Sequence, residues 1–145
     1  MFNFGLHNGP CNGANTTIPG GAATSAEYAG ELVQIAEKLT QYVQNTPAGE
    51  QKAKLLFAMT SPMLCDASSN AIVVELNRQA AKIMANYTIS TVDPYKAIVG
   101  KCGAVPQAAC FGSNGCFCPH CPGHGGAGYS WLANTTLAPA IRSLL

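Results

Sequence analysis

Apolar residues follow two kinds of pattern along the chain, which predict three buried strands alternating with two amphipathic helices. Strands are expected at residues 1–4, 53–60 and 88–92, and the second is a nearly continuous apolar run, as in a parallel strand buried on both faces. Helices are expected at about 24–44 and 69–85, where apolar residues recur at spacings of three and four. The apolar positions are Tyr28, Leu32, Ile35, Leu39 and Tyr42 in the first helix, and Val73, Leu76, Ala80, Ile83 and Met84 in the second. Because the connections are short, this order predicts right-handed crossovers and a small parallel sheet.

Local signals predict where these elements begin and end. The capping box Thr24-Ser25-Ala26-Glu27 predicts a helix that starts at Thr24. Ser61-Pro62 and Asp93-Pro94 end the second and third strands, and Asp93 is expected to form a turn or a cap. A last helix is expected from about Gly128, and Pro139 is expected to split or bend it.

Length and charge limit the classes of protein that fit this chain. A chain of 145 residues with 48% apolar content suits one compact domain with a real core. A formal net charge of +1, with only 10% charged residues, lacks the electrostatic footprint of a nucleic-acid binder or a membrane-surface protein. No apolar run approaches the roughly 20 residues of a membrane span. We therefore expect no nucleic-acid partner and no membrane partner, and nothing in the composition calls for a cofactor.

Cysteines are concentrated in a loop rich in glycine and proline, at about residues 102–127. Five of the seven cysteines and two of the three histidines lie there, which is typical of an oxidised, disulfide-linked loop in a secreted protein. The disulfide candidates are Cys11, Cys65, Cys102, Cys110, Cys116, Cys118 and Cys121, and the glycosylation candidates are Asn15, Asn86 and Asn134. An extracellular or secretory location is expected, although the chain begins without a signal peptide. The composition typical of a secreted protein and the missing signal peptide are consistent with each other if Met1 is an internal methionine of a longer chain.

Two other interpretations of the cysteine-rich loop stay open. Cys118-Pro119-His120-Cys121 resembles the redox motif of periplasmic thiol oxidases of the thioredoxin superfamily, but the Pro-Gly-rich residues after it do not continue a helix. Tetrahedral zinc accepts ligands such as Cys116, Cys118, Cys121 and His124. A second, well-separated pair of ligands is missing from the sequence. Disulfides are therefore favoured over a thiol-disulfide oxidoreductase or a metal site, and no metal is expected.

The order of elements and four short motifs resemble the SGNH (GDSL-like) hydrolases, a family of serine esterases and lipases with a three-layer α/β/α, flavodoxin-like fold. The motifs are Phe2-Asn3-Phe4-Gly5-Leu6-His7-Asn8, Met59-Thr60-Ser61-Pro62, Val92-Asp93-Pro94-Tyr95, and Pro119-His120-Cys121 followed by Gly128-Tyr129-Ser130-Trp131-Leu132. The first of them is similar to the family's third conserved block. The resemblance thus implies a parallel sheet whose N-terminal strands are missing, in a single partial domain spanning residues 1–145.

The same resemblance implies a set of site residues. His120, or alternatively His124, would be the catalytic base, and Gly5, His7 and Asn8 would border the oxyanion region. The implied ligand is a small ester or an acetylated carbohydrate. The family's nucleophilic Ser and oxyanion Gly have no counterpart, and no carboxylate occurs from Lys96 to Leu145, so the histidine lacks the group that orients it. The resemblance therefore implies a secreted ester hydrolase that is an inactive fragment or a degenerate copy.

A different class of function is also consistent with the sequence. The chain would then be a non-catalytic extracellular module, stabilised by disulfides, with a binding or structural role. In either case, a sheet that starts at the family's third strand leaves an open edge and an uncovered apolar face. We therefore expect self-association, or a partner that supplies the missing N-terminal half.

Overall fold

The computed structural model describes residues 1–3, 22–62, 67–111 and 127–145. Two long helices, several shorter ones and two short strands make up most of these residues. The elements are α1 (Ala22–Gln44), β1 (Leu56–Ala58), α2 (Ala67–Asn86), β2 (Ser90–Val92), α3 (Pro94–Cys102), the 3-10 helix η1 (Ala108–Phe111), α4 (Ala127–Leu132), the π-helix η2 (Ala133–Leu137) and α5 (Ala138–Arg142).

The strands are parallel, and β1 lies between the other two extended segments. On one side β1 pairs with β2, with Phe57 opposite Thr91. On the other side Phe2 forms a parallel bridge with Phe57. The Phe2 amide donates to the Leu56 carbonyl at 3.0 Å, and the Ala58 amide donates to the Phe2 carbonyl at 2.9 Å. The three segments predicted as strands therefore lie side by side in parallel, which confirms the predicted mixed α/β class and the parallel sheet.

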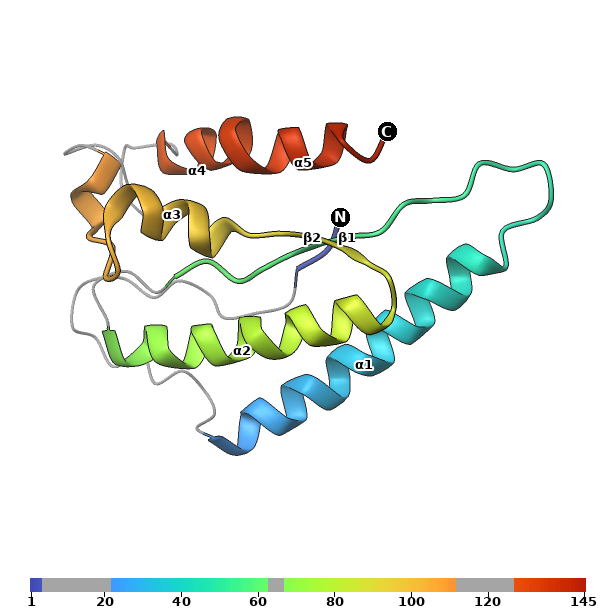
Figure 1. Cartoon of the computed structure of the whole chain (residues 1–145), viewed down its shortest axis with the longest axis horizontal. Coiled ribbons are helices and arrows are strands. Elements are labelled where there is room, and N and C mark those ends of the chain that lie inside the picture. Colours follow the sequence, from blue (N-terminus) through green and yellow to red (C-terminus); the bar gives the residue numbers. More distant parts are fainter. Residues whose placement is uncertain (4–21, 63–66, 112–126) are drawn as a thin grey trace.

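Helices cover both faces of the strands. Figure 1 shows α1 and α2 on one side and α3, α4 and α5 on the other. Phe57 and Met59 belong to the core shared with α1 and α2, whereas Leu56 and Ala58 pack toward Leu144 and the C-terminal helix. Alternate residues of β1 thus point to opposite faces. The prediction of a strand buried on both faces is confirmed.

The apolar stripe of α2 is buried as predicted, whereas the stripe of α1 is shorter than predicted. All five predicted positions of α2 are buried. In α1, Leu32 and Ala36 are buried, and burial raises the pKa of Tyr28 to about 12. Tyr42, however, is 76% exposed, so its assignment to the buried face was wrong. Helix α1 also begins at Ala22, two residues before the predicted capping box.

Proline residues shape the last two helical regions. Helix α3, which was not predicted, begins at Pro94, and the Asp93 carboxylate caps it by accepting the Lys96 amide at 2.7 Å. The C-terminal helix changes to a π-helical turn in η2, where the Ala138 amide donates to the Ala133 carbonyl. Proline has no amide to continue the α-helical pattern. The predicted interruption of the last helix near Pro139 and the capping role of Asp93 are thus confirmed.

Candidate functional site

The carboxyl ends of the parallel strands define the end of the molecule where a site is expected. The segment at Phe2, β1 and β2 all run toward the end at which α2 and α4 begin (Figure 1). In open α/β sheets, ligands bind at this end of the strands. Two motifs of the SGNH resemblance, Met59-Thr60-Ser61-Pro62 and Val92-Asp93-Pro94-Tyr95, lie at these carboxyl ends, and Gly128 lies near the start of α4.

Most of the predicted site residues lie outside the described part of the chain. This applies to the catalytic candidates His120 and His124 and to the oxyanion candidates Gly5, His7 and Asn8. It also applies to Asn15 and to Cys11, Cys65, Cys116, Cys118 and Cys121. The described residues therefore show the helices and strands that adjoin these segments in the sequence.

Asn77 fixes the direction in which the chain leaves β1, a role that the sequence reasoning missed. Its side-chain Oδ1 accepts the Thr60 amide at 2.8 Å, and its Nδ2 donates to the Thr60 carbonyl at 2.8 Å. Thr60 is 2% exposed, so α2 provides both hydrogen bonds that a neighbouring strand would otherwise supply. The signal in the sequence is an amide placed between Val73 and Ala80 on the buried stripe of α2.

A small cleft opens near the carboxyl ends of β1 and β2, between α2 and the start of α3. It has a volume of about 270 Å³, and Met59, Asn77 and Asp93 contribute to its walls. Its amide and carboxylate groups already have partners: Asn77 binds Thr60, and Asp93 caps α3. The Arg78 guanidinium lies 2.6 Å from Glu75 and, by hydrogen bonding, lowers the pKa of that carboxyl to about 2. Asp93 therefore acts as a helix cap here.

The described part of the cysteine-rich loop is held by a disulfide and an aromatic cluster. Cys102, at the end of α3, is bonded to Cys110 in η1, with Cα atoms 5.6 Å apart. The Phe111 and Trp131 rings lie 5.3 Å apart, and the Lys101 ammonium lies over both. Two of the seven disulfide candidates are thus paired, and they are the two cysteines among the described residues.

We expect at least two disulfides in the mature protein, because a cysteine-rich loop of glycine and proline is ordered by cross-links or by a metal. Two disulfides engage four of the seven cysteines, so alkylation without reductant should modify at most three thiols. Intact mass measured before and after alkylation gives this number, and a reduced sample modified at all seven is the control. Seven free thiols with stoichiometric zinc, in protein from an oxidising compartment, would favour the metal interpretation.

The remaining predictions concern the surface. Asn86 and Asn134 are exposed, so both sequons are accessible for glycosylation, which stays a prediction.

No helix in the described ranges is long and apolar enough to cross a bilayer. Within the same ranges, no group of three or more His, Cys, Asp or Glu residues is placed to hold a metal ion.

Comparison with known proteins gives no relative for this chain. No family model matches it, and neither curated proteins nor solved structures include a match.

Proposed function

We propose that the chain is part of an SGNH-hydrolase-like domain, with a three-layer, flavodoxin-like arrangement, that lacks ester hydrolysis of its own. The observation that carries the proposal is the order of the strands. The segment at Phe2, then β1, then β2 are adjacent, parallel and in chain order, with helices on both faces. In this arrangement Asn3, Thr60 and Asp93 lie at the carboxyl ends of their segments, at one end of the sheet. The family resemblance assigns site residues to that end.

In this proposal the chain contributes the histidine and part of the oxyanion region. His120, or His124, is the base, and Gly5, His7 and Asn8 border the site where the ester oxygen would develop charge. Hydrolysis by such a site also needs a serine exposed on a sharp turn between a strand and a helix. Ser61 lies three residues after the end of β1, and the next residue is the buried Pro62. Its position does not match such a turn.

The orienting carboxylate is the second missing part. Asp93 is the last acidic residue of the chain, and its side chain is engaged by the Lys96 amide at the start of α3. A histidine without a carboxylate partner loses the group that holds its tautomer and stabilises its charged form. The chain alone therefore lacks two of the groups that the reaction requires.

We expect the isolated chain to hydrolyse nitrophenyl acetate no faster than its His120→Ala variant. The reason is the absence of a nucleophile and an orienting carboxylate from the predicted site. The rate of nitrophenolate release at neutral pH is the measurement, and His124→Ala is the matched control for the alternative base. Saturable hydrolysis that is lost in one of the two variants would show that other residues complete the site.

A second candidate function is favoured by the disulfide between Cys102 and Cys110. A cross-link that closes a short surface segment next to the aromatic cluster of Phe111 and Trp131 suits a non-catalytic extracellular module. In that case the aromatic residues pack within the domain, and the cysteine-rich loop serves binding or structure. Both candidate functions predict no hydrolysis, so a hydrolysis assay does not distinguish them. A ligand of the module, such as an acetylated carbohydrate, would be found by a binding measurement.

A further inference from the structure

The disulfide between Cys102 and Cys110 lies directly beside the aromatic cluster of Phe111 and Trp131. Cys102 follows Lys101 at the end of α3, and Cys110 precedes Phe111 in η1. The Lys101 ammonium lies 5.3 Å from the centre of the Trp131 ring and 5.5 Å from the centre of the Phe111 ring. The cross-link thus holds together the two chain segments that place Lys101 and Phe111 against Trp131.

The segment at residues 104–110 has few other attachments to the fold. In the described part of the chain its hydrogen bonds are local: the Cys110 amide donates to the Gln107 carbonyl at 3.0 Å, and the Gln107 side chain donates to the Val105 carbonyl at 3.2 Å. Pro106 is fully buried and anchors the middle of the segment. The disulfide therefore fixes the far end of the segment.

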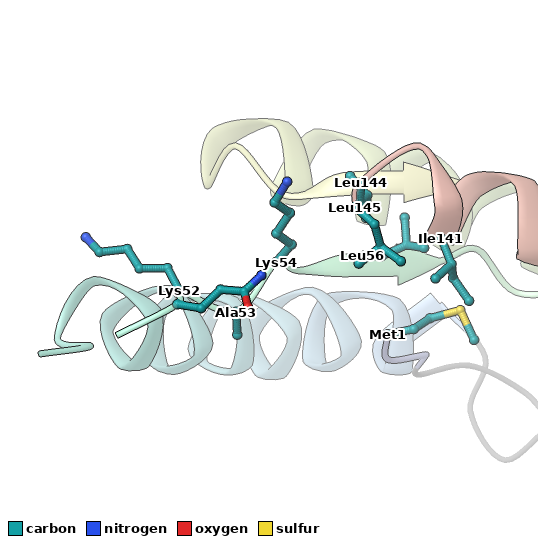
Figure 2. Close-up of a pocket in the computed structure, with 9 residues that line it drawn as sticks. Met1, Lys52, Ala53, Lys54, Leu56, Ile141, Leu144 and Leu145 are labelled. Carbon is teal, nitrogen blue, oxygen red and sulfur yellow. The ribbon is translucent and has the colours of Figure 1, made fainter. Parts of the chain in front are cut away.

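The helical region that carries Trp131 is held in place without the disulfide. Leu132 in α4 is buried in a cluster with Ile98 of α3. Farther along the same helical region, Leu144 packs against the core cluster that contains Leu56 of β1, and Figure 2 shows Leu144 beyond the end of α5, near Leu56. Loss of the cross-link should therefore leave Trp131 in place while η1 moves away from it.

The bond lies near the surface, outside the core around β1. Both cysteine residues are partly exposed, and exposed disulfides are reduced more readily than buried ones. The two cysteines are eight positions apart, and in the chain-entropy model a short loop gains less stability from its cross-link than a long one. Among the described residues, the core clusters on the two faces of β1 include none from 101–111. Opening the bond should therefore leave the strands and the helices that cover them folded.

We propose that the bond between Cys102 and Cys110 is a redox-sensitive latch that closes and opens the aromatic cluster. A dithiol reductant supplies the two electrons: one of its thiolates attacks a sulfur of the pair, forms a mixed disulfide with it and releases the other cysteine. The second thiol of the reductant then displaces the remaining cysteine, and the reductant leaves as a disulfide. The two protons of the reductant end on the two cysteine thiols. With the latch open, Phe111 and Lys101 separate and the Trp131 ring becomes more exposed.

Trp131 is the single tryptophan of the chain, so tryptophan fluorescence reports on the latch. We expect dithiothreitol to shift the emission maximum of the full chain to longer wavelength and to increase quenching by acrylamide. The far-ultraviolet circular dichroism spectrum should stay that of the folded protein. Peptide mass spectrometry shows whether the bond between Cys102 and Cys110 is present before the reductant is added and absent afterwards.

Two variants separate this bond from the other cysteines. The double variant Cys102→Ser and Cys110→Ser should show the shifted emission without reductant, and dithiothreitol should shift it no further. Phe111→Leu keeps the bond but removes the ring, so its Trp131 quenching should be increased even in the oxidised protein.

Three results would overturn the proposal. The first is reduction of the bond with no change in the emission maximum or quenching of Trp131. The second is loss of the helical circular dichroism signal on reduction, which would make the bond a structural cross-link. The third is an equal response of wild type and the double variant to dithiothreitol, which would assign the change to other cysteines. None of these measurements depends on ester hydrolysis.

Discussion

Replacing Phe57 by alanine is expected to destabilise the protein by about 3–5 kcal/mol. Phe57 is fully buried in the central strand, and its ring packs edge-on against the Phe2 ring with the centroids 5.2 Å apart. It also belongs to the core cluster that joins β1 to α1 and α2. The substitution therefore leaves a cavity where the three extended segments and the helical layer meet. Because small domains are stable by only about 5–15 kcal/mol, much of the stability should be lost.

Urea unfolding followed by far-ultraviolet circular dichroism measures this effect. Tyr42→Ala is the matched control, since it also removes an aromatic ring but from a side chain that is 76% exposed. Its free energy of unfolding should change by less than about 0.5 kcal/mol. Equal shifts for the two variants would contradict the position of β1 at the centre of the core.

The second large effect is expected for Asn77→Ala, at about 2–4 kcal/mol. This substitution removes the two hydrogen bonds, each 2.8 Å long, that join the Asn77 side chain to the Thr60 amide and the Thr60 carbonyl. Thr60 is buried, so neither backbone group gains a full partner from water. The unfolding midpoint should fall, and amide hydrogen exchange at Thr60 should become faster.

Arg78→Ala is the control for this prediction, because Arg78 follows Asn77 on the same helix. Its ion pair with Glu75 is exposed to solvent, and exposed pairs contribute little to stability. The midpoint of Arg78→Ala should therefore stay close to that of wild type. If Asn77→Ala and Arg78→Ala behave alike, Asn77 does not hold the end of β1.

The sequence predicts the elements that have a strong period and predicts less well those that depend on tertiary contacts. The stripe of α2 from Val73 to Met84 is recognisable because its apolar residues keep helical spacing along the whole buried face. Tyr42 fits the same spacing in α1, but the end of α1 extends past the strands (Figure 1), so no layer covers that side chain. Helix α3 has nine residues and few buried side chains, so its cap at Asp93 is its main signal.

The candidate site was harder to predict for a physical reason. The role of Asn77 depends on a hydrogen bond across 17 positions to Thr60, and periodicity carries no information about such a contact. The catalytic candidates His120 and His124 rest on the family resemblance, and they stay predictions.

Labelling with a fluorophosphonate probe tests most directly whether the chain is an SGNH-like scaffold without a working nucleophile. Such a probe forms a covalent bond with a serine that a neighbouring base has activated. Intact mass after incubation with excess probe gives the stoichiometry, with the His120→Ala variant treated in parallel. We expect no mass increase in either protein. Stoichiometric labelling of one serine in the wild-type chain, lost in His120→Ala, would contradict the account by showing a complete catalytic site.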